Sequence, residues 1–179
     1  MPTESEMSKT QRVLVAAHKV PLLSMVFRKL NSRQREIVEM LKQTSLFSDL
    51  TGRELAELLH LLHERTFAAG EVIFHEGDPG FGVYVVFKGE VEISKALKDG
   101  RTAMANLGPG EIFGEISLLD GSGRSAQASA AVKTELIGFY RTELGNLLER
   151  NPSLASKILF ALARQLGMRL RAANEQFAR

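Results

Sequence analysis

Apolar residues recur every three or four positions over the first part of the chain, up to about residue 42. This period is that of an amphipathic helix, whose apolar side packs on a core. A proline at position 21 has no N–H to donate, and it is expected to break or kink the first helix. The apolar positions are Val13, Leu14, Ala17, Leu22, Leu23, Val26, Phe27, Leu30, Ile37, Val38, Met40 and Leu41. A helical segment is therefore expected over residues 1–45.

A further helix is predicted by the polar residues that open it. Thr51 is followed three positions later by Glu54, which is the capping-box signature of a helix start. Leucines at positions 55, 58, 59 and 62 give this helix an apolar side. We expect it to end near residues 68–70, where the sequence Ala-Ala-Gly provides a stop.

Over residues 70–140 the pattern changes to short apolar runs separated by glycine-containing turns. The runs with strand character are residues 72–74, 83–87, 91–93, 102–104 and 136–140. Many short strands at this spacing are typical of a small barrel or jelly roll, which curls on itself and leaves few exposed edges. The predicted fold class is therefore α+β, mainly β. A double-stranded β-helix or jelly-roll barrel is expected over residues 46–141, with helices on either side.

Helical spacing returns after Thr142, and residues 142–179 are expected to form C-terminal helices. Asn151 and Pro152 suit the N-cap and the first position of a long helix. Its apolar ridge at i+4 spacing consists of Ile158, Leu162, Leu166 and Leu170. Because a terminal helix has little barrel left to cover, we expect this ridge to pair two copies as a homodimer. Core packing is the alternative.

Composition places the chain among ordinary globular proteins, with 44% hydrophobic and 25% charged residues. The formal charge of +2 is too small for a whole-chain nucleic-acid surface, so any anion site must be local. The absence of cysteine excludes disulfides, thiolate zinc sites and cysteine nucleophiles, and it fits a reducing cytosol. The N-terminus resembles neither a signal peptide nor a membrane span. A cytoplasmic protein without membrane contact is expected.

The strongest chemical signal lies in residues 110–126. A short helix bounded by glycines is predicted there, with Glu115 at its start and Arg124 beyond the following loop. Free N–H groups at a helix start attract an anion, and Gly114 lets a ligand approach the backbone. Arg124 can bind a phosphate in a bidentate manner, whereas an ionised Glu115 only accepts hydrogen bonds and suits sugar hydroxyls. A phosphate beside a ribose describes a nucleotide.

These residues carry a resemblance to a known family. The sequence Phe113-Gly114-Glu115, a small turn and Arg124-Ser125-Ala126 resembles the phosphate-binding cassette of cyclic-nucleotide-binding domains. That family includes kinase regulatory subunits, cyclic-nucleotide-gated channels and bacterial Crp/Fnr regulators. Residues 46–50, 70–74, 76–78 and 86–91 are similar to the family as well, so the resemblance extends over roughly residues 45–175.

The resemblance implies a role for each matching position. Glu115 would bind the ribose 2′-hydroxyl and Arg124 the cyclic phosphate. The family often has proline before this arginine, whereas Gly123 stands here, which predicts a more flexible loop. Ser125 suits either a phosphate or a guanine, so cyclic AMP is expected and cyclic GMP stays open. The implied ligand-binding residues are Gly114, Glu115, Ile116, Ser117, Arg124 and Ser125.

Other motifs fail to form a site. His60 and His63, with Glu64 beside them, are two histidines three positions apart without a third clear ligand, and such pairs are far more often surface residues than metal sites. His75 is alone in the predicted barrel, so the histidine set of a metal-holding cupin is missing. The sequence has no nucleophile elbow, Walker loop or dinucleotide fingerprint. We therefore expect a protein that is not an enzyme and holds no metal or cofactor.

The sequence thus predicts a regulatory protein that senses cyclic AMP, with the C-terminal helix closing over the base as a lid. One alternative is an interaction module that binds an unidentified effector protein and either no ligand or a cyclic dinucleotide. In the ligand-free version, Glu115 and Arg124 would form a purely structural ion pair. Another is a truncated Crp/Fnr-type transcription regulator. Direct DNA binding is disfavoured because the chain ends at Arg179, without room for a helix-turn-helix after the long helix.

Overall fold

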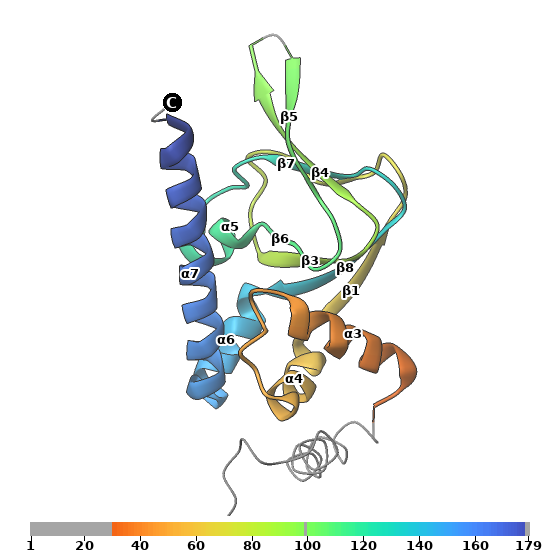
Figure 1. The fold of residues 1–179 in the computed structure, drawn as a ribbon, viewed down its shortest axis with the longest axis vertical. Coiled ribbons are helices and arrows are strands. Elements are labelled where there is room, and N and C mark those ends of the chain that lie inside the picture. The colour runs from red at the N-terminus through yellow and green to blue at the C-terminus, as the bar shows by residue number, and fades with distance from the viewer. Residues whose placement is uncertain (1–29, 99, 178–179) are drawn as a thin grey trace, which may run out of the picture.

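The computed structural model describes residues 30–98 and 100–177, which form a β-roll with helices at one end and along one side (Figure 1). The predicted first helix and its kink at Pro21 lie outside the described residues. Two four-stranded antiparallel sheets make the roll, with strand orders β1-β8-β3-β6 and β2-β7-β4-β5. The strands are β1 His63–Phe67, β2 Val72–Phe74, β3 Gly82–Lys88, β4 Val91–Leu97, β5 Gly100–Leu107, β6 Ile112–Phe113, β7 Gln127–Ala130 and β8 Thr134–Tyr140. The predicted mainly β fold with flanking helices is confirmed.

Strand β3 is apolar on both faces because it separates two cores. Val83 and Val85 pack with the helices outside the roll, whereas Val86 faces the roll interior with Phe113 and Leu136. Successive side chains of a strand point to opposite faces, so a strand covered on both sides reads as a continuous apolar run. This explains why residues 83–87 show no alternation.

The helices cover the outer face of the β1-β8-β3-β6 sheet (Figure 1). Helix α3 begins after Asn31, whose side chain and that of Gln34 form a capping box. Helix α4 begins after Thr51, where the predicted capping box with Glu54 is present. A shared core then joins these helices to the roll and to the C-terminal helices. The helices are α3 Ser32–Gln43, α4 Gly52–Leu58, α5 Glu115–Asp120, α6 Arg141–Arg150 and α7 Pro152–Phe177.

The helix predicted from Thr51 to residues 68–70 is shorter than expected. Helix α4 ends at Leu58, a 3₁₀ turn follows over Leu59–Leu61, and the chain then enters β1. Strand β1 pairs with β8 along its whole length, from His63 opposite Gly138 to Phe67 opposite Thr134. This pairing depends on residues about 70 positions away, so local apolar spacing could not indicate it. Strands β6 and β7 were also missed, because β6 has two residues and β7 is made of small and polar ones.

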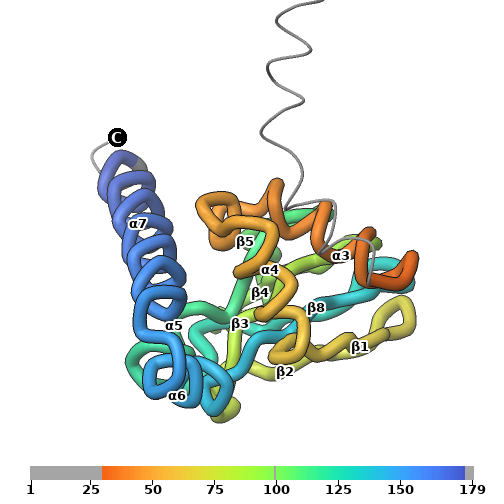
Figure 2. Tube along the Cα trace, turned by 90° about the horizontal axis from the view of Figure 1, so that it is seen from below, coloured from red at the N-terminus to blue at the C-terminus, as the bar shows by residue number. Residues whose placement is uncertain are grey.

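The expected role of the α7 ridge needs a correction. Ile158 and Leu162 are fully buried within the monomer, where they pack with residues of α3, α4 and α6. Leu166 is half-buried, and Leu170 is 63% exposed. The four-residue ridge therefore cannot face a second chain as a unit. Figure 2 shows α6 beside the start of α7, while the far end of α7 extends away from α6.

No helix within the described ranges is both long enough and apolar enough to cross a membrane.

Candidate functional site

Helix α5 stands where the sequence predicted a short helix bounded by glycines. Gly114 at its N-cap has φ 78° and Gly121 at its C-cap has φ 75°, a left-handed conformation that favours glycine. No side chain caps the first N–H groups of the helix. The short helix lies between β6 and the loop that returns to β7, and it brings Gly114, Glu115, Ile116 and Ser117 to one wall of a cavity.

Arg124 is buried next to Gly114 and lines the same cavity. Its Nη1 donates to the carbonyl oxygens of Gly82 and Gly114, at 2.8 Å each. Its guanidinium carbon lies 4.2 Å from the ring centroid of Phe74, a cation–π contact. The Nε atom is buried without a hydrogen-bond partner. The side chain is thus fixed by some of its donors while another is left unpaired.

Burial shapes the ionisation of this region. Desolvation lowers the pKa of the Arg124 guanidinium, although an arginine stays protonated at neutral pH. Burial, together with the neighbouring Tyr140, raises the pKa of Tyr84 to about 12. The ring of Tyr84 lies 5.7 Å from the Arg124 guanidinium. Arg124 is therefore a cation beside neutral aromatic rings, which compete little with an anionic ligand.

The loop between α5 and Arg124 is tied to the opposite loop by backbone hydrogen bonds. The Arg124 N–H donates to the Asp78 carbonyl at 2.8 Å, and the Arg124 carbonyl accepts from the Gly77 N–H at 2.8 Å. Gly123 itself forms an antiparallel bridge with Pro79. A Cβ at Gly123 would come within 2.8 Å of the Gly77 carbonyl oxygen. Close approach of two backbones is therefore a reason for glycine here, whereas the sequence suggested flexibility.

Glu115 is completely buried, and its two carboxylate oxygens differ in their hydrogen bonding. Oε1 lies 2.5 Å from Nη1 of Arg169 on α7, while Oε2 is buried with no hydrogen-bond partner. Nη2 of Arg169 donates to the carbonyl oxygen of Ile112 at 2.8 Å. The alternative of a structural pair between Glu115 and Arg124 is not what the structure shows, since Glu115 pairs with Arg169 instead. The sequence offered no signal for Arg169, which is 54 residues away along the chain.

The two predicted serines occupy different environments. Ser117 is buried, its hydroxyl lies 3.4 Å from the Gly123 carbonyl, and its own carbonyl accepts from Arg141. Ser125 is exposed. Both line the cavity, together with Ile116, whose side chain is 40% exposed. The structure therefore brings all six predicted residues to one cavity.

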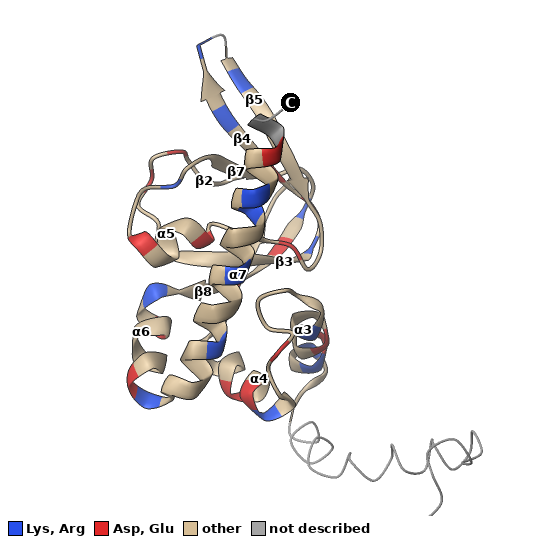
Figure 3. Cartoon of the chain, turned by 60° about the vertical axis from the view of Figure 1, so that its left-hand side comes forward, with Lys and Arg blue, Asp and Glu red and all other residues tan. Residues whose placement is uncertain are grey.

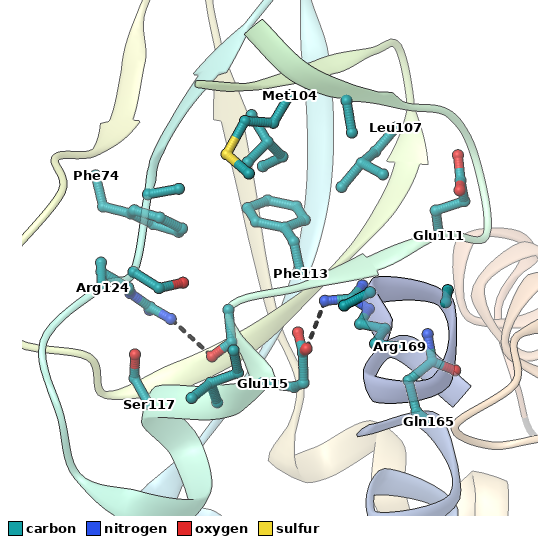
Figure 4. A pocket seen from close by; sticks show the side chains of 18 residues that line it. Phe74, Met104, Leu107, Glu111, Phe113, Glu115, Ser117, Arg124, Gln165 and Arg169 are labelled. Atoms are coloured by element: carbon teal, nitrogen blue, oxygen red, sulfur yellow. Dashed lines mark hydrogen bonds and ion pairs between the residues drawn. The ribbon is translucent and has the colours of Figure 1, made fainter. Parts of the chain in front are cut away.

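The cavity has a volume of about 550 Å³, within the range of small-molecule sites. Figure 4 shows Glu115 with Arg124 to one side and Arg169 to the other, below Met104, Leu107 and Phe113. The remaining lining residues are Phe74, Ile93, Ala105, Glu111, Ala126, Gln165, Ala172 and Ala173. A cation, a hydroxyl acceptor and an apolar roof suit a ligand with an anionic group, a sugar and a flat ring.

The histidines set aside from the sequence do not gather here. His63 lies 3.4 Å from Glu143, outside the cavity. Within residues 30–98 and 100–177, no group of three or more His, Cys, Asp or Glu side chains could hold a metal ion.

The β-roll and the cavity define a small-molecule-binding domain that combines a short helix, a buried glutamate and a buried arginine. The family model of the cyclic nucleotide-binding domain matches residues 64–151. The cyclic AMP receptor protein of Thermus thermophilus is 38% identical over 127 residues, which are 70% of this chain and 59% of that protein. The chain belongs to the cyclic nucleotide-binding domain family.

Solved structures agree with this membership. The N-terminal domain of a transcriptional regulator from Streptomyces coelicolor superposes with a TM-score of 0.67 and 36% identity, covering 77% of this chain and 94% of that one. A cyclic nucleotide-binding domain from Methylobacillus flagellatus superposes with a TM-score of 0.72 and 30% identity, covering 80% and 82%. The chain spans less than two thirds of the length of the Thermus relative.

Proposed function

We propose that this chain is a regulatory module that senses cyclic AMP. In this proposal, Arg124 binds the cyclic phosphate, Glu115 binds the ribose 2′-hydroxyl, and the base lies under the apolar roof beside α7. The name of the Thermus relative supports cyclic AMP as the ligand. The module carries out no reaction and acts in the cytoplasm through an effector that the sequence does not identify.

One observation carries the proposal. Three buried side-chain polar atoms lack a hydrogen-bond partner among the described residues, and two of them are Glu115 Oε2 and Arg124 Nε. A buried polar atom without a partner costs free energy, so such atoms are usually paired. An acceptor and a donor left unpaired in one cavity match a hydroxyl and an anionic oxygen of the same ligand.

Cyclic GMP and cyclic dinucleotides are the competing ligands. Ser125 is exposed at the cavity and can approach a phosphate or a guanine, which keeps cyclic GMP open. A cyclic dinucleotide would need room for a second nucleotide in addition to the first. Calorimetric titration of the full chain with cyclic AMP, cyclic GMP, a cyclic dinucleotide and non-cyclic AMP separates these cases. We expect cyclic AMP to bind most tightly. If none of the four nucleotides binds, the proposal is overturned.

The same titration with Arg124→Ala tests the site. Loss of a charged hydrogen-bond donor should weaken cyclic AMP binding by about 1.5–3 kcal/mol. Arg124 also donates hydrogen bonds to the carbonyls of Gly82 and Gly114, so its loss can destabilise the fold as well as the ligand complex. Titration of Arg124→Lys and thermal melts of both variants separate the effect on binding from the effect on folding. Arg53→Ala on the exposed surface of α4 is the control, and it should bind as the unmodified chain does. Unchanged affinity in both Arg124 variants would remove this residue from the site.

We also propose a homodimer through α7, with a different seam from the ridge suggested by the sequence. Phe160 is 71% and Leu170 63% exposed, and the small residues Ala163 and Gly167 lie between them. These four positions follow the 3-4-3 spacing of a coiled-coil seam. Two such helices would cover each other's apolar side, which a monomer leaves in water. A second copy of this chain is therefore the proposed partner.

A further inference from the structure

The guanidinium of Arg124 is buried without an ion-pair partner. Helix α5 carries an acidic residue at each end, Glu115 and Asp120 (Figure 3). Glu115 pairs with Arg169, however, and no ion pair among the residues that the structure describes includes Arg124. A carboxylate paired with this arginine would compete with the phosphate of a ligand. The contacts that hold Arg124 therefore leave its charge available to a ligand.

Hydrogen bonds account for only part of this attachment. Within residues 30–98 and 100–177, both side-chain hydrogen bonds of Arg124 come from Nη1, which donates to the carbonyls of Gly82 and Gly114. Nε is buried without a partner. Burying an ionised group is costly unless its charge is compensated. Contacts with the rest of the guanidinium must therefore supply part of that compensation.

Two aromatic rings provide those contacts. The guanidinium carbon lies 4.2 Å from the ring centroid of Phe74, which Figure 4 shows next to it, and 5.7 Å from that of Tyr84. Phe74 belongs to β2 and Tyr84 to β3, so both sheets of the roll contribute a ring. The negative face of a ring attracts a cation but offers no strong hydrogen-bond acceptor. The rings therefore stabilise the buried charge and leave Nε unpaired for an anionic ligand.

The ring of Tyr84 is itself fixed by its neighbours. It stacks on Phe113 with the ring centroids 5.5 Å apart, and it meets Tyr140 edge-on at 6.2 Å. Its hydroxyl is also hydrogen-bonded to that of Tyr140. Gly138 leaves room for this pair, because a Cβ there would come within 3.2 Å of both tyrosine side chains. Tyr84 thus has a defined position beside Arg124.

We propose that Tyr84 is a positioning residue that, together with Phe74, holds the buried guanidinium of Arg124 in place for the anionic group of the ligand. Phe74 lines the cavity, whereas Tyr84 does not, so the effect of Tyr84 on binding passes through Arg124. The face of the ring carries this effect. Tyr84→Phe should therefore keep the function that Tyr84→Leu loses. This inference rests on the proposed function, because it assumes that Arg124 binds the phosphate.

The first experiment observes Arg124 directly in the ligand-free full chain. Its Nε–H is buried, so the exchange of this proton with solvent can be followed in proton–nitrogen NMR spectra. Exchange should be faster in Tyr84→Leu than in the unmodified chain, and it should be unchanged in Tyr84→Phe. Equal exchange in Tyr84→Leu and the unmodified chain would overturn the proposal.

Phe67→Leu is the matched control for this experiment. Phe67 is buried in the same core inside the roll, but its ring contacts the guanidinium of Arg65 instead of that of Arg124. The variant therefore removes a ring from the core without touching the proposed contact, and it should leave the exchange of the Arg124 Nε–H unchanged. If Phe67→Leu accelerated this exchange as much as Tyr84→Leu, the effect would be a general loosening of the core, and the proposal would be wrong.

The second experiment titrates the same variants with cyclic AMP. Tyr84→Leu should weaken binding by about three- to thirtyfold, whereas Tyr84→Phe should stay within about twofold of the unmodified chain. In an Arg124→Ala background, Tyr84→Leu should have little further effect, because the two residues act as one unit. An equally large loss in both backgrounds would give Tyr84 a role that does not involve Arg124 and would overturn the proposal. If cyclic AMP fails to bind the unmodified chain, the proposed function fails, whereas the NMR experiment still tests how Arg124 is held.

Discussion

Gly114 and Arg124 are in direct contact at the centre of the site. Nη1 of Arg124 donates to the Gly114 carbonyl at 2.8 Å, and a Cβ on Gly114 would come within 2.3 Å of that same nitrogen. Gly114 also has φ 78°, which an L side chain adopts at a cost of about 1–2 kcal/mol. The start of α5 and the position of Arg124 therefore depend on each other.

Gly114→Ala should displace Arg124 and weaken cyclic AMP binding by about tenfold or more, since a charged hydrogen-bond partner of the phosphate is moved. Calorimetric titration measures the affinity, and a thermal melt reports the accompanying strain. Gly145→Ala is the control. A Cβ on Gly145, which lies on α6, would meet no neighbouring atom within 4 Å, so alanine there should stabilise the helix by about 0.5–1 kcal/mol. Full affinity in Gly114→Ala would show that Arg124 tolerates the shift or does not bind the ligand.

Glu115→Gln should weaken binding of cyclic AMP and have little further effect on its 2′-deoxy analogue. The reason is that the ribose hydroxyl alone donates to this carboxylate in the proposed complex. Glu111→Gln is the matched control, because Glu111 lines the same cavity but is exposed and accepts from the Gly108 N–H. Competition binding with both nucleotides gives the two affinities. Equal losses for both would mean that Glu115 serves only as the partner of Arg169.

Phe160→Asp should convert the proposed dimer into monomers without unfolding the roll. Phe160 is 71% exposed, so its replacement should change monomer stability by no more than about 0.5 kcal/mol. Leu162→Ala provides the contrast: Leu162 is fully buried, and its truncation should cost about 2–5 kcal/mol of unfolding free energy. Light scattering and chemical denaturation measure the two effects. An unmodified chain that is monomeric at tens of micromolar would contradict the dimer and leave the ligand site unaffected.

Acid should weaken the attachment of α3 to the roll through Glu135. The hydrogen bond from Arg33, whose Nη2 lies 2.5 Å from Glu135 Oε2, holds the pKa of this carboxyl below its usual 4.5. Because the folded-state pKa is the lower one, the pair stabilises the fold above about pH 4.5, and this contribution is lost as the pH falls through the folded-state pKa. Both side chains are about one third exposed, so solvent limits the contribution to under about 1 kcal/mol.

Glu135→Gln should therefore be less stable than the unmodified chain near pH 7, and this difference in stability should shrink as the pH falls below 4.5. Thermal midpoints across this range give the comparison. Glu149 is exposed on α6, so Glu149→Gln should have the same thermal midpoint as the unmodified chain at every pH. If the thermal midpoints of Glu135→Gln and the unmodified chain differed more as the pH fell, the result would contradict the role assigned to the pair of Arg33 and Glu135.

Much of the site follows from the sequence because its parts are local. Gly114, Glu115, Arg124 and Ser125 lie within twelve residues, and a short helix with a return loop is enough to bring them together. Short-range rules for caps, turns and strand runs likewise predicted α4, α5 and the start of α7. The family resemblance added the role of each position, which spacing alone does not supply.

Tertiary structure decided what depends on contacts distant in sequence. The segment over residues 63–67 became a strand because β8 offered it hydrogen-bond partners, although its apolar spacing favoured a helix. Leu162 became part of the core because α3, α4 and α6 cover that face of α7, whereas Phe160 and Leu170 are left exposed. Arg169 joined the site only because α7 passes α5 in space. A sequence window shows which side of a helix is apolar, but only the packed chain determines which elements that side meets.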